Sequence, residues 1–184
     1  MSLVIVRAVA RAEANDELHL GRLLILLSAL GGKSRKSVDG IMKLAKLDFL
    51  LRYPNCLERA LAAMGREPTS ALVQEHERTS IESKMIRFRY GPWDGRYRRW
   101  ISMLFARGLV TTSVEKRTVQ ISLTVRGAQI ADLLSAQPSF LVQERRAHLL
   151  RDAFGGLSGT KLKDFIYKTF PEIIDMKWGK EIEL

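Results

Sequence analysis

Apolar residues recur three and four positions apart in several stretches of the chain, which is the spacing of a helix with one buried face. In the stretch 94–107 the residues expected on that face are Tyr97, Trp100, Ile101, Leu104 and Phe105. In residues 16–30 they are Leu18, Leu20, Leu23, Leu24, Leu26, Leu27 and Leu30. The same spacing predicts further helices at 37–54, 55–64, 140–154 and 161–170.

A β-hairpin is predicted directly after the 94–107 helix. Residues 109–114 and 118–125 are rich in Val, Ile and Thr, and the charged tripeptide Glu115, Lys116 and Arg117 joins them. Alternation of apolar and polar residues in the second run predicts one buried face. Thr124 can cap the helix that follows, whose expected buried residues are Ala128, Ile130, Ala131, Leu133 and Leu134.

Turn and cap residues define where the predicted elements begin. Asn15 or Asp16 can cap the first helix, and Ser37 with Asp39 offers a start for the 37–54 helix. Residues 81–90 alternate as a strand with one basic face. In the block that follows, we expect Gly91 and Pro92 to turn the chain, Trp93 to enter the core and Asp94 to cap the next helix, so these four residues are interpreted as structural.

A helix, a hairpin with a basic tip and a second helix, in that order, are typical of the second half of a winged helix-turn-helix. The predicted fold class is therefore α+β, mainly helical, with an insertion and a C-terminal helical extension. We expect an N-terminal segment at 1–15, a winged-helix domain at 16–135 that includes an insertion plus strand at 54–92, and a helical tail at 136–184. The apolar stripes of the tail must pack on its own body or on a partner chain.

Positive charge is concentrated in one region of the chain. The net charge is +10, and residues 78–126 hold 11 Lys or Arg against 3 Asp or Glu, a surplus of eight. Such a concentration favours contact with nucleic-acid phosphates, although an acidic protein could meet the same face and a basic face can also be merely solvated. The expected DNA contacts are Arg96, Arg98, Arg99 and Ser102 on the 94–107 helix, Lys116 and Arg117 on the hairpin, and Lys33, Arg35 and Lys36 in the loop before the 37–54 helix.

Signals for catalysis are missing from the sequence. The three histidines lie in unrelated segments, no metal-ligand spacing occurs, and no motif for a nucleotide or other cofactor is present. Cys56 is the single cysteine and cannot form an internal disulfide, so a reducing, cytoplasmic setting is expected. No apolar run approaches the roughly 20 residues that a membrane-spanning helix needs. We therefore expect neither enzymatic activity, nor a metal or cofactor, nor a membrane partner.

Two stretches carry a resemblance to a known group of proteins. Residues 42–54, MKLAKLDFLLRYP, and 85–109, MIRFRYGPWDGRYRRWISMLFARGL, resemble the small winged-helix middle components of bacterial three-component ABC-ATPase systems, a group that includes Lamassu-type anti-phage defence. The resemblance covers roughly residues 16–135. It implies an adaptor without activity of its own, encoded between an SMC-like or Rad50-like ATPase and an effector, which joins the ATPase to the effector or to DNA.

Three functions remain open at this point. The first is the accessory subunit implied by the resemblance, with DNA, an SMC-like ATPase and an effector as partners. The second is a free-standing transcriptional regulator, which would need a homodimer because one winged helix reads too few base pairs for operator specificity. The third is an adaptor that binds only protein and uses its basic face against an acidic partner.

Overall fold

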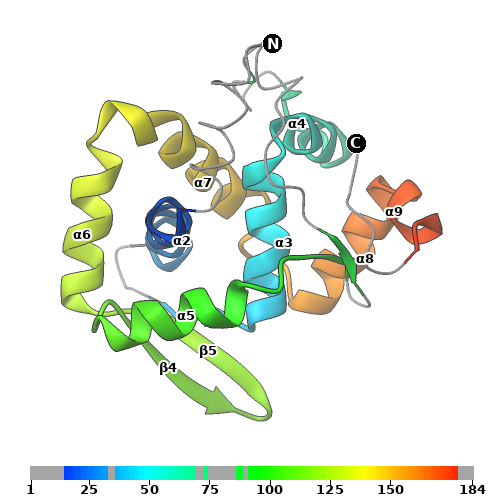
Figure 1. Ribbon diagram of the computed structural model, residues 1–184. Coiled ribbons are helices and arrows are strands. Elements are labelled where there is room, and N and C mark those ends of the chain that lie inside the picture. The colour runs from blue at the N-terminus through cyan, green and yellow to red at the C-terminus, as the bar shows by residue number, and fades with distance from the viewer. Residues whose placement is uncertain (1–14, 33–35, 69–72, 74–85, 89–90, 178–184) are drawn as a thin grey trace, which may run out of the picture.

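The computed structural model describes residues 15–32, 36–68, 73, 86–88 and 91–177, and it has an α+β, mainly helical architecture (Figure 1). Its helices are α2 (Asp16–Gly31), α3 (Ile41–Arg52), α4 (Pro54–Ala63), α5 (Tyr97–Ala106), α6 (Val125–Ser135), α7 (Leu141–Phe154), α8 (Gly159–Thr169) and α9 (Glu172–Asp175), with a 3-10 turn at Pro138–Phe140. Its strands are β1 (Val38–Asp39), β2 (Ile86–Phe88), β3 (Gly91–Trp93), β4 (Val110–Glu115) and β5 (Thr118–Leu123).

Helix α2 forms the centre of the fold. Figure 1 shows it nearly end-on, with α6 to its left, α7 above it and α5 below it, and all three helices contact it. The five residues 23–27 of α2 are all buried, which is the burial expected of a helix that is covered on most sides. The predicted N-terminal cap is confirmed, because the Asn15 side chain accepts a hydrogen bond from the Glu17 backbone N–H at 3.0 Å.

The three-stranded antiparallel sheet has the order β1-β5-β4. The predicted hairpin is confirmed: β4 pairs with β5 from Val110 opposite Leu123 to Glu115 opposite Thr118. Strand β1, which pairs Val38 with Ile121, was not expected. The predicted helix start at Ser37 or Asp39 is therefore wrong, since this segment pairs as a strand and α3 begins only at Ile41.

The hairpin is joined firmly to helix α6. The predicted cap is confirmed, since Thr124 Oγ1 accepts from the Gly127 backbone N–H at 2.9 Å and donates to the Gly108 carbonyl oxygen at 2.8 Å. At Gly127 the two backbones approach so closely that a Cβ atom would lie 1.9 Å from the Leu109 carbonyl oxygen. Helix α5, the hairpin and α6 are thus held in a fixed arrangement by backbone contacts.

A second, two-stranded sheet lies between α4 and α5 in the chain. Strand β2 pairs with β3, with Phe88 opposite Gly91 and Ile86 opposite Trp93. The expectation that Gly91 and Pro92 turn the chain is wrong, because both residues belong to strand β3. The remainder of the strand predicted at 81–90 lies outside the described residues, as does the side chain of Trp93.

Three residues expected in the core are exposed instead. Leu18, Phe105 and Leu133 keep 43%, 55% and 64% of their surface accessible. Leu18 and Phe105 belong to helices whose other apolar residues are largely buried, whereas α6, the helix of Leu133, buries only Gly127, Ala128 and Ala131. The predicted apolar faces are therefore wider than the surfaces that pack against the core. The apolar stripe of α5 is otherwise confirmed, with Tyr97, Trp100, Ile101 and Leu104 all buried.

The C-terminal helices pack on the body of the same chain. Leu150 and Phe154 of α7, Ile166 of α8 and Phe170 belong to the same hydrophobic core as the buried residues of α2 and α3. The Phe49 ring of α3 meets the Phe170 ring edge-on, with centroids 5.7 Å apart. Of the two alternatives for the apolar stripes of the tail, the structure shows packing on its own body.

Lys46 is a charged residue buried within this core. Its side chain lies on α3 with 2% of its surface accessible, and its Nζ donates to the Met42 carbonyl oxygen of the same helix at 3.0 Å. Burial, with a smaller contribution from the charge of Lys163, lowers the pKa of Lys46 to about 8. The folded state therefore disfavours the protonated amine.

We predict that Lys46→Met raises the free energy of unfolding at pH 7 by about 2 kcal/mol, because it removes a buried charge. Between pH 8 and 10.5 the folded wild type has lost this proton while the unfolded chain keeps it, so wild-type stability rises and the difference from the variant shrinks. Urea unfolding at several pH values from 7 to 10 measures the free energy of unfolding of the wild type and of the variant. The exposed Lys168→Met on α8 is the control, and a Lys46→Met variant less stable than wild type at pH 7 would contradict the prediction.

Candidate nucleic-acid interface

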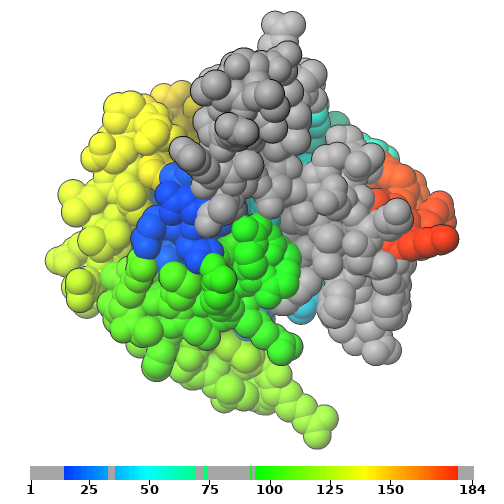
Figure 2. Space-filling view, viewed as in Figure 1, coloured from blue at the N-terminus to red at the C-terminus, as the bar shows by residue number. Residues whose placement is uncertain are grey.

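The exposed side of α5 carries three of the residues that were predicted to contact DNA. Arg98, Arg99 and Ser102 are exposed, as predicted, because the buried positions of this helix occupy its other side. Arg96 is only partly exposed and precedes the first turn. Figure 2 shows α5 on the visible face of the molecule, with the hairpin projecting beyond the body below it.

The hairpin tip presents two cations in an unusual backbone conformation. Lys116 and Arg117 form the two-residue turn, and both have positive φ angles, 46° and 70°. Such a turn favours Asn and Gly, since a side chain in the left-handed region is strained. Both residues are exposed. The tip therefore holds two positive charges at positions where turn chemistry alone would select other residues.

A buried carboxylate on α3 connects α2 to α5. Asp48 has no accessible surface and accepts from Arg22 of α2, with Nε–Oδ1 and Nη2–Oδ2 distances of 2.7 and 3.1 Å. The Tyr97 hydroxyl of α5 donates to the same carboxylate. Burial alone would raise the pKa of Asp48, but the guanidinium charge of Arg22 and the hydrogen bonds hold it below its usual value. Asp48 thus fixes three helices to one another.

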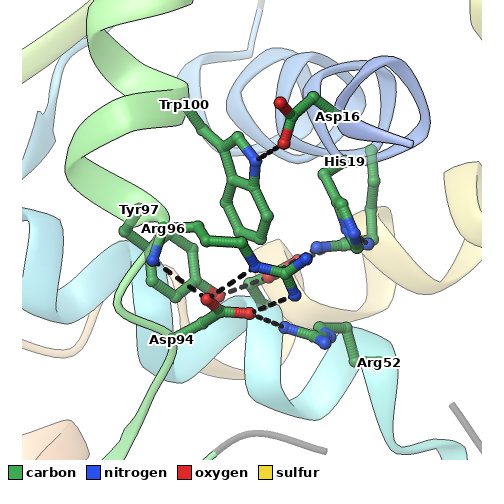
Figure 3. Close-up of polar contacts among 9 residues, drawn as sticks. Asp16, His19, Arg52, Asp94, Arg96, Tyr97 and Trp100 are labelled. Carbon is green, nitrogen blue, oxygen red and sulfur yellow. Dashed lines mark hydrogen bonds and ion pairs between the residues drawn. The ribbon is translucent and has the colours of Figure 1, made fainter. Parts of the chain in front are cut away.

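A second carboxylate, Asp94, fixes the start of α5 (Figure 3). It accepts from Arg52 of α3 at 3.2 Å and from the Arg96 guanidinium at 2.8 Å, and its Oδ1 also accepts the Arg96 backbone N–H at 3.0 Å. Burial would raise the pKa of Asp94, but these bonds and the Arg52 charge place it far below its usual value. The prediction that Asp94 is the N-cap is wrong, since Arg96 occupies that position and α5 begins at Tyr97.

Arg96 has a structural role because its side chain is held by two residues of the same chain. Its guanidinium binds Asp94 and lies over the Trp100 ring, 4.8 Å from the centroid. In Figure 3 it lies between these two residues. The expected contact between Arg96 and DNA therefore has to compete with an ion pair and a cation–π contact inside the protein.

Two more arginines of this region are held by the first turn of α2. Asp16 pairs with Arg99 and accepts from the Trp100 indole N–H at 2.8 Å, and this last bond is the main cause that lowers the pKa of Asp16. Glu17 accepts two bonds from Arg107, at 2.6 and 2.7 Å. Surface ion pairs are weak, so they direct these two side chains toward α2 more than they add stability.

Four predicted cations remain without such a partner, three of them on α5 and the hairpin. Within the described residues, no carboxylate forms an ion pair with Arg98, Lys116 or Arg117. Lys36 is likewise exposed and forms no ion pair with a described carboxylate, but strand β1 separates it from the start of α3 at Ile41. Lys33 and Arg35 lie outside the described residues. The candidate interface is therefore Arg98 with Ser102 on α5 and Lys116 with Arg117 on the hairpin.

The described residues contain neither a cluster of metal ligands nor a reactive thiol. No three His, Cys, Asp or Glu side chains come together there in a way that could hold a metal ion. Burial raises the pKa of the Cys56 thiol to about 12, which leaves it unreactive at neutral pH. No described helix is long and apolar enough to span a bilayer.

No protein family, curated protein or solved structure matches this chain. Its function must therefore be argued from the arrangement of its own residues.

The partners of the arginines could not be found from sequence spacing, because Asp16 and Arg99 are 83 positions apart. One signal was nevertheless available. Asp48 and Arg52 are charged residues inside the apolar run KLDFLLR of a predicted helix, and a charge in such a run is expected to be paired.

We predict that the double substitution Lys116→Asn with Arg117→Gly raises the free energy of unfolding by about 1 kcal/mol, because it relieves the strain of two positive φ angles. Chemical denaturation measures the change. The matched control is Lys116→Gln with Arg117→Gln, which removes the same charges but keeps the strain and should not stabilise. Equal stabilisation by both double variants would show that charge repulsion, and not backbone strain, is responsible.

Proposed function

We propose that this protein is a non-catalytic winged-helix adaptor that binds DNA through α5 and the hairpin tip. The observation that carries the proposal is the placement of exposed cations on two adjacent elements, Arg98 on α5 and Lys116 with Arg117 on the hairpin that follows it. Cations on a helix and on a neighbouring hairpin can contact phosphates on two sides of a groove.

The topology supports the winged-helix assignment. Helix α2, strand β1, helix α3, helix α5 and the β4–β5 hairpin follow in the order of that scaffold, with α4 and the β2–β3 pair as an insertion. Strand β1 pairs with β5 and so connects the segment after the first helix to the hairpin. In this arrangement α5 corresponds to the helix that enters the DNA groove in helix-turn-helix proteins.

The adaptor role rests on the resemblance to the middle components of three-component ABC-ATPase systems. The two resembling stretches, 42–54 and 85–109, include most of α3 together with β2, β3 and α5. A hydrogen bond from Tyr97 to Asp48 and an ion pair between Arg52 and Asp94 join the first stretch to the second. We propose an SMC-like ATPase and an effector as protein partners, in a system of anti-phage defence. Co-purification with the products of neighbouring genes tests this part, and a stable complex with an ATPase subunit is the expected result.

The DNA-binding part is tested with a labelled duplex across a salt series. We expect the logarithm of the association constant to fall linearly with the logarithm of the salt concentration. The slope of this line should become less steep by about 0.9 for each phosphate contact that a substitution removes. The double variant Lys116→Gln with Arg117→Gln should therefore make the slope less steep by about 1.8, and the triple variant that adds Arg98→Gln should weaken binding further.

The matched control is Arg99→Gln, which removes one positive charge from the same helix. Because Asp16 already pairs with Arg99, this variant should weaken binding less than Arg98→Gln does. Absence of binding at low salt, or a triple variant that binds as wild type does, would contradict DNA binding. Binding of a palindromic sequence by a dimer would instead support a transcriptional regulator.

A further inference from the structure

One exposed row along α5 combines three different kinds of side chain. Arg98, Ser102 and Phe105 are four and three positions apart, so they lie in one row along the helix. All three are exposed. We call this row the α5 crest. It offers a guanidinium group, a hydroxyl group and an aromatic ring, in that order from the N-terminal end of the helix.

Ion pairs within the protein explain why the crest is a mixture of side chains and not a row of cations. Arg99 and Arg107 flank the crest, but Asp16 and Glu17 of α2 hold both of them. Arg96 is bound by Asp94. The cations that could have made α5 a uniformly basic phosphate-binding surface are therefore engaged within the protein, and the crest that remains is chemically mixed.

Phe105 is not required by the hydrophobic core. Its neighbour Leu104 is fully buried, whereas Phe105 leaves 55% of its surface accessible and is the one aromatic residue among the exposed large apolar residues described. A phosphate contact has no use for an aromatic ring, because the ring carries neither a positive charge nor a hydrogen-bond donor. A large exposed aromatic residue gains free energy when a ligand removes it from water.

Resting on the proposed DNA binding, we propose that the α5 crest reads bases in the major groove. Arg98 donates to the O6 and N7 atoms of a guanine, and Phe105 packs against the C5-methyl group of a thymine, which are contacts that these side chains make with base edges. Seven residues of helix span about 10.5 Å, and successive base pairs are about 3.4 Å apart. The guanine and the thymine should therefore lie about three base-pair steps apart.

The nearby hairpin favours DNA over a protein as the ligand of the crest. The hairpin projects beyond the body in Figure 2, and neither Lys116 nor Arg117 at its turn is paired with a carboxylate among the described residues. The protein thus presents a mixed, base-reading row next to a purely cationic tip. Phosphate contacts at the tip would position the duplex, and contacts along the crest would select its sequence.

The test begins with selection of duplexes from a randomised pool by the full-length protein. We expect enrichment of a guanine and a thymine about three steps apart. The selected thymine is then replaced by deoxyuridine, which lacks only the methyl group. This replacement should weaken binding by the wild type about fourfold and should leave Phe105→Ala binding unchanged, because that variant has no ring to contact the methyl group.

The controls separate this inference from the proposed function. Val125→Ala, an exposed apolar truncation on α6, should keep the deoxyuridine effect of the wild type. Salt-dependent binding without any selected base, or an equal deoxyuridine effect in the wild type and in Phe105→Ala, would overturn base reading and leave backbone binding intact. Absence of DNA binding at low salt would overturn both, and loss of a protein partner by Phe105→Ala would then assign the crest to that partner.

Discussion

The position of α5 depends on two carboxylates that are buried between helices. Asp48 of α3 binds Arg22 of α2 and the Tyr97 hydroxyl of α5, while Asp94, before α5, binds Arg52 of α3. Hydrophobic contacts alone would allow α5 to slide or rotate, because they have little directional preference. Hydrogen bonds between buried charged groups are directional, and leaving one such charge unpaired costs about 3 to 5 kcal/mol. These pairs therefore specify one orientation of the helix.

That orientation divides the basic residues into two groups. Arg96, Arg99 and Arg107 hold the helix in place or are held by α2, whereas Arg98 faces outward. The surplus of positive charge in residues 78–126 is thus a poor measure of the charge available to a ligand. The interface that we propose is smaller than the sequence suggested, and it is more varied in chemistry because it includes Phe105.

Much of the architecture could be predicted from the sequence, since apolar spacing marks α2 and α5 and β-prone runs mark the hairpin. The two-residue strand β1 is too short to produce such a pattern. Phe105 was assigned to the core because its position continues the stripe, but it lies at the edge of the buried arc of α5, about 80° around the helix from Tyr97. Ion pairs such as Asp16–Arg99 join distant segments and appear only when the chain is folded.

The central claim is that α5 and the hairpin tip together form the surface that meets DNA. Its most direct test is to record the backbone amide NMR signals of the full-length protein while a short duplex is added. The account predicts shifts confined to residues 98–106 and 115–118, with α8 and α9 unchanged. Shifts centred on α8 and α9, with the signals of α5 and the hairpin unaffected, would contradict it.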